Sequence, residues 1–320
     1  MKVLANDGIS KSGQAALEEA GFEVITTTVA QEQLIKYINE NQIDVILVRS
    51  ATTVRKDLID ACPSIKIIGR GGVGMDNIDV DYARGKGLHV INTPASSSES
   101  VAELVFAHLF GGVRFLYDAN RNMPLEGDSK FNALKKNYAK GRELRGKTIG
   151  IIGFGRIGYE VARIALGVGM KVIASDKFVD KATIKVDFYN GQFINVEIET
   201  EPMKYLLEHS DFITLHVPAQ KDYVISEKQF KQMKDGVGIV NAARGGIIDE
   251  VALIQAIENG KVAFAGLDTF DNEPTPSVQI LMNPKISLTP HIGAATDEAQ
   301  DRIGTELASQ IISILKSENV

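Results

Sequence analysis

The stretch TIGIIGFGRIGYEVARIALGVGMKVIASD, residues 148–176, decides the fold. After Thr148 come four residues that are apolar or glycine, and they predict a short buried strand. Apolar residues then recur with helical spacing from Ile157 to Leu166, and Lys171–Ser175 predicts a second strand. A strand, a glycine-rich turn, a helix and a second strand make one βαβ unit, in which the two strands are parallel.

The turn of this unit has the spacing of a dinucleotide-binding loop: Gly153-Phe154-Gly155-Arg156-Ile157-Gly158. Gly153 permits the tight turn, Gly155 lets the backbone approach a pyrophosphate, and Gly158 lets the helix pack on the strand. Asp176 ends the second strand, where it can accept hydrogen bonds from the adenosine ribose and repel the extra phosphate of NADP. Lys177 weakens that exclusion a little. NAD is the expected cofactor, and the alternative is a purely structural glycine turn.

Short apolar runs alternate with amphipathic stretches on both sides of this unit. The predicted strands are Val3–Ala5, Phe22–Thr26, Asp44–Val48, Ile65–Gly69, Leu88–Asn92, Asp211–His216, Gly238–Asn241, Val262–Leu267 and Ile286–Thr289. The predicted helices are Ser12–Ala20, Gln31–Asn39, Met203–His209, Lys228–Met233, Glu250–Glu258 and Asp297–Lys316. Strands that are apolar from end to end and separated by helices predict an α/β fold, with parallel, doubly wound sheets covered on both faces.

Three segments depart from this alternation. The residues from Ser98 to Asn120 predict one long helix, and Arg121–Lys147 is polar with little periodicity, so loops and short turns are expected there. The segment Lys185–Val196 centres on Asn190-Gly191 between strand-favouring residues, which is a strong hairpin signal. The hairpin is either a surface ornament or a subunit contact.

Composition narrows the class of protein. A length of 320 residues suggests two domains, and 44% hydrophobic with 24% charged residues is ordinary for a globular protein. The formal net charge of −6 argues against nucleic acid or an anionic membrane as a general partner, although local arginines can still hold a small anion. A single cysteine, Cys62, indicates a reducing compartment, and no signal-peptide core follows Met1. We therefore expect a cytoplasmic protein, with no metal.

Polar side chains follow three of the late predicted strands: Arg244, then Asp268 and Glu273, then His291. Ligands bind at the carboxyl ends of parallel strands, so these groups are candidates for a site beside the cofactor. An arginine can bind a carboxylate and polarise a C2 oxygen, and a histidine paired with a carboxylate can move a hydroxyl proton. The substrate class expected from this set is a 2-hydroxy or 2-keto acid. Taken singly, each residue could equally be a turn residue or a solvated charge.

Two further histidines stand out. His216 ends a predicted strand near the cofactor loop, and His108 lies in an apolar helix, where we expect it to be packed.

Five motifs, in chain order, resemble those of the D-2-hydroxyacid dehydrogenase family: Gly-Phe-Gly-Arg-Ile-Gly, Leu-His-Val-Pro, Asn-Ala-Ala-Arg-Gly-Gly, Leu-Asp-Thr-Phe-Asp-Asn-Glu-Pro and Thr-Pro-His-Ile-Gly-Ala. The resemblance implies that Arg244, Glu273 and His291 are catalytic, with His291 as the acid/base. It also implies cofactor contacts at Gly153, Gly155, Arg156, Ile157, Gly158, Asp176, His216, Val217, Pro218, Ala242, Ala243, Arg244, Asp268, His291, Gly293 and Ala294.

The family's architecture implies two Rossmann-like domains between which the chain crosses twice. Residues 1–97 plus 293–320 would form a flavodoxin-like substrate-binding domain, and residues 98–292 the NAD-binding domain. Relatives dimerise through the cofactor domain, and the segment from about Val101 to Arg145 carries more apolar residues than one helix face needs. A homodimer is therefore expected.

The N-terminal half is similar to the 3-phosphoglycerate dehydrogenase branch, which implies oxidation of D-3-phosphoglycerate to 3-phosphohydroxypyruvate. The implied substrate contacts are Arg49, Ser50, Arg70, Gly72, Val73, Gly74 and Arg244. Arg49 and Arg70 suit a phosphate, and the loop of residues 72–74 can offer backbone N–H groups to a carboxylate.

Alternatives to this assignment stay open. They are a glyoxylate or hydroxypyruvate reductase, another D-2-hydroxyacid dehydrogenase, and a non-catalytic protein that senses dinucleotide. Arg49 could also do no more than brace its own loop. No regulatory domain is expected after Val320. The chain has no Trp, which many relatives carry in the loop that corresponds to Arg121–Tyr138.

Overall fold

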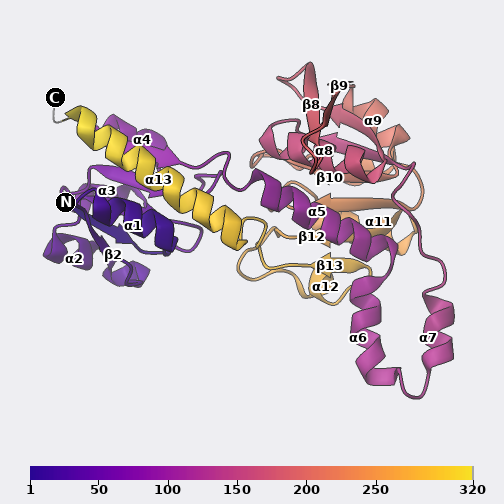
Figure 1. The fold of residues 1–320 in the computed structure, drawn as a ribbon. Coiled ribbons are helices and arrows are strands. Elements are labelled where there is room, and N and C mark those ends of the chain that lie inside the picture. The colour runs from indigo at the N-terminus through magenta and orange to yellow at the C-terminus, as the bar shows by residue number, and fades with distance from the viewer. Residues whose placement is uncertain (319–320) are drawn as a thin grey trace. The chain divides into compact units, whose positions relative to one another are not determined.

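A computed structural model describes residues 1–318, and the side chains of residues 1–316. The chain forms two compact units (Figure 1). Unit 1 contains Met1–Ser98 and the segment that begins at Ala294, and unit 2 is Glu99–Gly293. Both boundaries lie one residue later than the sequence predicts, so Ser98 belongs to unit 1 and Gly293 to unit 2. The predicted α/β fold, with two doubly wound sheets and a chain that crosses twice, is confirmed.

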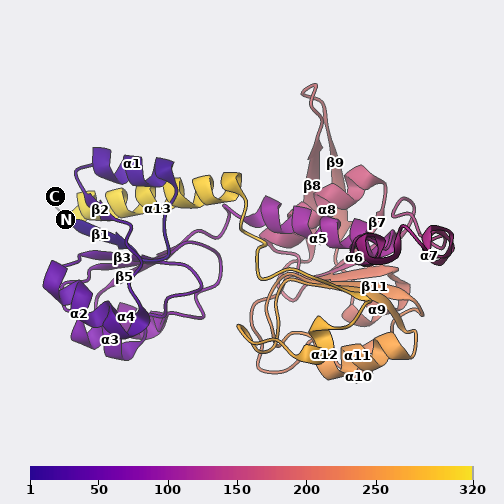
Figure 2. The same ribbon diagram turned by 90° about the horizontal axis from the view of Figure 1, so that it is seen from below.

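Unit 1 is built on a parallel sheet of order β2-β1-β3-β4-β5. Its strands are β1 Lys2–Ala5, β2 Glu23–Ile25, β3 Val45–Val48, β4 Ile67–Arg70 and β5 His89–Asn92. Its helices are α1 Lys11–Glu19, α2 Gln31–Asn41, α3 Lys56–Ala61, α4 Val80–Gly85 and α13 Asp297–Glu318. Helices α2, α3 and α4 pack on one face of the sheet, and α1 and α13 on the other (Figure 2). All four residues of β3 are buried, as expected for a strand covered on both faces.

Helix α13 returns to unit 1 at the end of the chain and lies against α1. The two helices meet at Gly13 and Gly304, where a Cβ on Gly13 would lie 2.5 Å from the Gly304 carbonyl carbon. That distance is too short for any side chain, so glycine at these positions sets how closely the helices approach. The first and last helices of the chain thus share one core.

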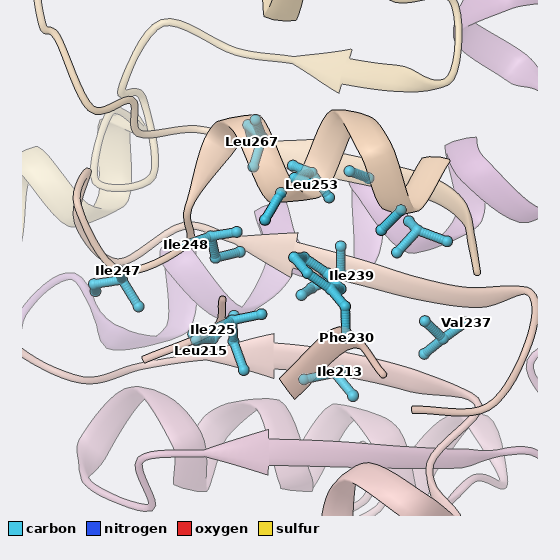
Figure 3. Packing of buried hydrophobic residues seen from close by; sticks show 14 of the residues in the cluster. Ile213, Leu215, Ile225, Phe230, Val237, Ile239, Ile247, Ile248, Leu253 and Leu267 are labelled. Carbon is cyan, nitrogen blue, oxygen red and sulfur yellow. The ribbon is translucent and has the colours of Figure 1, made fainter. Parts of the chain in front are cut away.

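Unit 2 is built on a parallel sheet of order β13-β12-β11-β10-β6-β7. Its strands are β6 Thr148–Ile152, β7 Lys171–Ser175, β10 Phe212–Leu215, β11 Val237–Asn241, β12 Val262–Leu267 and β13 Ile286–Leu288. The helices on one face are α9 Met203–His209, α10 Glu227–Phe230, α11 Glu250–Glu258 and α12 Val278–Leu281. Figure 3 shows the core on this face, where Ile239 of β11, Phe230 of α10 and Leu253 of α11 lie together. The other face is covered by α5 Ser98–Val113 and α8 Arg156–Val168.

Each sheet has one point where the strand order reverses. In unit 1 the neighbours at this point are β1 and β3, and in unit 2 they are β6 and β10. The loops that leave the carboxyl ends of two such strands turn in opposite directions and open a crevice, which is where α/β proteins bind ligands. The strand order therefore predicts that ligands bind at the loops after β1, β3, β6 and β10.

The predicted single helix Ser98–Asn120 is wrong. Helix α5 ends at Val113, Phe115 takes a left-handed backbone with φ 56°, and a new helix, α6, spans Leu116–Glu126. The predicted absence of helices in Arg121–Lys147 is also wrong, because α7 spans Phe131–Asn137. No residue of α6 is buried and Pro124 lies inside it, so its sequence carries a helix-breaking residue and no core-facing pattern that the sheet would require.

Helices α6 and α7 extend from the sheet of unit 2 as a two-helix arm, defined as residues 116–137 (Figure 1). The Tyr138 hydroxyl ties them together by donating to Asp118 Oδ2 at 2.8 Å. Within residues 1–318, no single helix has the length and apolar character to cross a membrane. Helices α5 and α6 meet those criteria only when taken together, and they are bent by 55°.

The predicted hairpin is confirmed. Strands β8 Lys181–Asp187 and β9 Phe193–Glu199 pair antiparallel around the Asn190-Gly191 turn, with Gly191 at φ 82°. Ile184 and Ile198 are buried in the core that α8 shares, which fixes the base of the hairpin. The end that carries the turn projects from unit 2 (Figure 2).

Candidate active site

The glycine-rich loop after β6 is built as tightly as its sequence predicts. Gly153 has φ 92°, and a Cβ there would lie 2.5 Å from the His216 carbonyl oxygen. A Cβ on Gly158 would lie 2.3 Å from the Gly153 carbonyl oxygen, so any side chain would push α8 away from β6. These two glycines are required by the packing of the loop itself.

Gly155 differs from its two neighbours in the motif. It precedes the first residue of α8, and a Cβ there would meet no atom of the described chain within 4 Å. The space lies at a helix N-terminus, where free N–H groups and the helix dipole favour an anion. The loop therefore has room for a pyrophosphate at the position where the fold would bind one.

Asp176 is fixed by backbone amides. Its Oδ2 accepts from Phe154 N at 2.6 Å, and its Oδ1 accepts from Phe178 N at 2.7 Å and Val179 N at 3.2 Å. The carboxylate thus joins the glycine-rich loop to the end of β7. A carboxylate oxygen can accept more than one hydrogen bond, so these contacts are compatible with a ribose hydroxyl as an additional donor.

His216, Val217 and Pro218 follow β10, across the reversal point from the glycine-rich loop. His216 Nε2 lies 3.0 Å from Thr214 Oγ1, and Nδ1 is buried without a hydrogen-bond partner in the described chain. Burial lowers the pKa of the imidazole to about 3, so the ring is neutral at physiological pH. A buried, unpaired nitrogen beside an open loop fits a site completed by a bound polar molecule.

His291 and Glu273 form the hydrogen bond that the sequence predicts, with 2.8 Å between His291 Nδ1 and Glu273 Oε2. Burial raises the pKa of Glu273, but hydrogen bonds from His291 and the Phe270 N–H, with the charges of His291 and Arg244, outweigh it and leave the pKa below its usual value. Glu273 is therefore a carboxylate at neutral pH, and Nδ1 carries the proton. His291 Nε2 remains as the nitrogen that can exchange a proton.

Asp268 holds the backbone that follows His291. This carboxylate is 1% exposed, and it accepts from Ile292 N at 2.8 Å, Gly293 N at 2.9 Å and the Thr289 hydroxyl at 2.7 Å. His291 itself has φ 55°, a left-handed conformation that is unfavourable for a residue with a side chain. The hydrogen bonds to Asp268 stabilise that conformation and so direct the His291 ring toward Glu273. They also place Gly293 in unit 2.

Arg244 lies in the turn after β11 (Val237–Asn241), and that turn is anchored to the segment that carries Glu273. Arg244 Nη1 donates to the Ala243 carbonyl at 2.6 Å, and Gly246 N donates to Asp271 Oδ1 at 2.7 Å. A Cβ on Gly245 would lie 1.8 Å from the Phe270 carbonyl oxygen. The two segments are thus in direct contact, and the charge of Arg244 acts on Glu273.

The loop that carries Arg49 in unit 1 is fixed through its backbone. The Asp7 carboxylate, after β1, accepts from Arg49 N at 2.6 Å and from Thr52 N at 3.1 Å. Asn77 Nδ2 donates to the carbonyl oxygens of Arg49 at 2.8 Å and Thr52 at 2.6 Å. In the part of the chain that the structure describes, the Arg49 guanidinium forms no hydrogen bond or ion pair. The loop therefore does not depend on that side chain.

Arg70 ends β4, next to the β3 end that precedes Arg49. Its Nη1 donates to the Gly71 carbonyl at 3.3 Å and lies 1.6 Å from where a Cβ of Gly72 would be. In the loop of residues 72–74, which the sequence predicts to offer backbone N–H groups to a carboxylate, Gly72 N donates to the Arg70 carbonyl at 2.9 Å. That amide is already used inside the loop, so only the N–H groups of Val73 and Gly74 are left as candidates.

The structure divides the predicted site residues between the two units. Unit 1 carries Arg49, Ser50, Arg70, Gly72, Val73, Gly74 and Ala294, and unit 2 carries the others, among them Arg156, Ile157, Ala242 and Ala243. Sequence reasoning missed Asp7, Asn77 and Asp271, whose carboxylates and amide hold backbone. Asp7 lies two residues after β1 at the reversal point, and that position could have identified it. Within residues 1–318, no group of three or more His, Cys, Asp or Glu side chains is placed to hold a metal ion.

Comparisons with known proteins agree with this geometry. A family model described as "D-isomer specific 2-hydroxyacid dehydrogenase, NAD binding domain" matches residues 106–293. The hydroxypyruvate reductase of Thermotoga maritima is 42% identical over 98% of this chain and 98% of that protein. The D-3-phosphoglycerate dehydrogenase of Methanocaldococcus jannaschii is 38% identical over 99% of this chain, which spans 58% of that longer protein. The NAD+-bound 3-phosphoglycerate dehydrogenase structure of Entamoeba histolytica has a TM-score of 0.76 at 28% identity, over 99% of this chain and 95% of that one.

Proposed function

Because the chain belongs to the D-isomer specific 2-hydroxyacid dehydrogenase family, we propose that it oxidises D-3-phosphoglycerate to 3-phosphohydroxypyruvate. The protein is an NAD-dependent D-2-hydroxyacid dehydrogenase with a Rossmann-type cofactor domain. The reaction class and cofactor follow from the family, and the substrate and residue roles are our proposal.

The substrate assignment rests on one observation, which is that the Arg49 guanidinium has no hydrogen bond or ion pair in the described part of the chain. Its loop is held by Asp7 and Asn77 through the backbone, and its guanidinium is not used by the described part of the chain. Arg70 lies at the end of the neighbouring strand. An arginine that is not needed by its own fold is suited to a ligand, and its planar fork matches phosphate oxygens.

His291 is the proton-transfer group in this proposal. Its Nδ1 is bonded to Glu273, so Nε2 accepts the proton of the C2 hydroxyl as the C2–H bond breaks and the C2 oxygen becomes a ketone. When bound, NAD supplies the acceptor for the hydride and its electron pair. The ionised Glu273 stabilises the protonated ring that results.

Arg244 binds the substrate carboxylate and polarises the C2 oxygen. The open space at Gly155 would hold the pyrophosphate of NAD, and Asp176 its adenosine ribose. The unpaired His216 nitrogen and the buried residues Ala242 and Ala243 would complete the cofactor site.

The test is NADH oxidation by the wild-type protein with phosphohydroxypyruvate, hydroxypyruvate, glyoxylate and pyruvate in parallel, repeated with Arg49→Ala. A charge-assisted hydrogen bond is worth ~1.5–3 kcal/mol, so kcat/KM for phosphohydroxypyruvate should fall by ~10–150-fold. Hydroxypyruvate has no phosphate, and its kcat/KM should change by less than about twofold. Arg84→Ala, at an exposed arginine of α4, is the matched control and should alter neither substrate. Equal losses on both substrates would make Arg49 structural.

One observation favours a second candidate, a hydroxypyruvate reductase. The Thermotoga maritima protein of that name matches 98% of both chains at 42% identity. This candidate predicts that wild-type protein prefers hydroxypyruvate and that Arg49→Ala does not separate the two substrates. The same four-substrate assay therefore decides between the candidates.

We also propose that the protein is a cytoplasmic homodimer. The support for the dimer is the two-helix arm, where Leu116, Leu125 and Phe131 are more than half exposed. The support for the cytoplasm is that the sequence has a single cysteine, Cys62, which is free and buried.

A further inference from the structure

A line of buried side chains leads from α5 to the carboxylate that holds the His291 backbone. His108 of α5 is 3% exposed. Its Nδ1 lies 2.9 Å from Ser287 Oγ on β13, and its Nε2 lies 3.0 Å from Thr289 Oγ1, directly after that strand. The Thr289 hydroxyl in turn donates to Asp268 Oδ1 at 2.7 Å. His108 is therefore hydrogen-bonded through both nitrogens, in addition to being packed as the sequence predicts.

The direction of each hydrogen bond follows from the last one. A carboxylate only accepts, so the Thr289 proton points at Asp268 and Thr289 Oγ1 must accept from His108 Nε2–H. His108 Nδ1 then accepts from the Ser287 hydroxyl. Burial lowers the pKa of His108, and the nearby Asp268 charge offsets this only in part, so the ring is in the neutral form that this arrangement requires.

The position of the ring is itself constrained. A Cβ on Gly266 of β12 would lie 2.6 Å from His108 Cβ, so glycine at this strand position lets α5 approach the sheet. The imidazole consequently sits between α5 and the carboxyl ends of β12 and β13. From there its one N–H reaches the hydroxyl that orients Asp268.

We propose that His108 is a positioning residue for the proton transfer at His291. Its Nε2–H fixes the Thr289 hydroxyl, Thr289 orients the Asp268 carboxylate, and Asp268 holds the Ile292 and Gly293 amides that keep His291 in its left-handed conformation. His108 touches neither substrate nor cofactor in this scheme. The inference rests on the proposed role of His291.

Replacing His108 by asparagine or by glutamine tests its two ring nitrogens separately. An Asn side chain places its polar group near the position of Nδ1, and a Gln side chain places it near the position of Nε2. The Gln amide can still donate to Thr289, so His108→Gln should keep kcat within about threefold of wild type. His108→Asn retains only the Ser287 side and His108→Leu retains neither, and both should lose about 10-fold in kcat, as one lost hydrogen bond of ~1.4 kcal/mol implies. KM for the keto acid should change by less than about twofold, since substrate contacts are untouched.

The assay is NADH-dependent reduction of hydroxypyruvate or phosphohydroxypyruvate, whichever the wild type uses better, with the Tm of each variant as the folding control. A His108→Leu variant with wild-type kcat would overturn the proposal, and so would equal kcat for the Gln and Asn variants. If proton transfer is the step affected, the solvent deuterium isotope effect on kcat should rise in the Asn and Leu variants and not in Gln.

Thr289 provides an independent test should the His108 variants fold poorly. Thr289→Ser keeps the hydroxyl and should keep kcat, while Thr289→Val should lose as much as His108→Leu. The double variant His108→Leu/Thr289→Val should be no slower than Thr289→Val alone, because both changes break one line of contacts. Additive losses would show two separate effects and reject the proposal.

His291→Asn separates this inference from the proposed function. If that variant keeps wild-type turnover, the role of His291 falls and this inference falls with it. If His291→Asn is impaired while His108→Leu is not, only this inference fails.

Discussion

At the residue scale, the proposed chemistry of His291 depends on which of its two ring nitrogens is available. Its Nδ1 is hydrogen-bonded to Glu273 at 2.8 Å, which leaves Nε2 for the proton transfer that we propose. His291→Asn removes that nitrogen, so kcat should fall by ~10²–10⁴ while NADH affinity, measured by fluorescence titration, stays nearly unchanged. Near wild-type turnover in this variant would contradict the assignment.

Glu273→Gln tests the charge of the partner instead. Reduction of a keto acid needs the ring protonated, and the lost carboxylate no longer stabilises that form. The alkaline limb of the kcat/KM profile for reduction should therefore move to lower pH, because Glu273 and His291 no longer interact as opposite charges. Glu273→Asp keeps the charge and serves as the control, and a profile that does not move in the Gln variant would argue against electrostatic support.

We propose that Asp176 sets the preference between the two nicotinamide cofactors. Its carboxylate stands at the end of β7, and a 2′-phosphate placed there would meet a like charge, which is costly when partly desolvated. Wild-type protein should prefer NADH to NADPH by on the order of 10–100-fold in kcat/KM. Asp176→Asn removes the charge, so the preference should shrink, and because its single oxygen can replace only one of the two that accept from backbone amides, the Tm of this variant is the control. Equal use of both cofactors by the wild type would refute the assignment.

Substitutions at two glycines of the cofactor loop, which joins β6 to α8, distinguish an effect on folding from an effect on cofactor binding. A Cβ on Gly158 would collide with backbone at 2.3 Å, whereas one on Gly155 would enter open space. Gly158→Ala should therefore lower Tm by several degrees, since overpacking typically costs ~1–3 kcal/mol. Gly155→Ala should keep Tm and weaken NADH binding by about 10-fold or more, because it fills the space left for the pyrophosphate. Equal Tm losses in the two variants would contradict this reading.

The two-helix arm supplies the other prediction at this scale. Leu125 and Phe131 are 77% and 57% exposed, so changing both to Lys should not disturb the fold of one subunit. If the arm is the subunit contact, light scattering at micromolar concentration should show a dimer for wild type and a monomer for the double variant. Tyr189→Lys at the hairpin turn is the matched control, since Tyr189 is fully exposed. A dimer that only Tyr189→Lys dissociates would move the interface to the hairpin.

Helices and strands could be predicted from the sequence where their buried residues form a recognisable pattern of apolar side chains. Strands β6, β7 and β12 have the bounds that were expected, because each contains a short apolar run that closely follows a lysine. The arm was not predictable, because its helix α6 buries nothing, and the left-handed Phe115 that separates it from α5 carries no sequence signal. At the site, motif spacing identified His291 and Glu273. The supports at Asp7 and Asn77 are contacts between distant segments that no local pattern encodes.

At the scale of the whole molecule, the two units differ in how their cores are assembled. Unit 2 is one continuous stretch, and unit 1 closes its core only with α13, through Ala308, Ile311 and Leu315. The sequence predicted both boundaries to within one residue only because the motifs resembled a family. Nothing in the composition of α13 shows which sheet it covers.

Because unit 1 is discontinuous in sequence, the ribosome synthesises its first part before unit 2 and its last helix after unit 2. Helix α13 begins at Asp297, long after α1 ends at Glu19, so the first sheet emerges with the face under α1 incompletely covered. Unit 2 becomes complete in the meantime and can fold first, although it is encoded second. Until the last helix is synthesised, the apolar surface around Val3, Leu17 and Leu47 therefore lacks part of its cover, which is the kind of exposed surface from which aggregation starts.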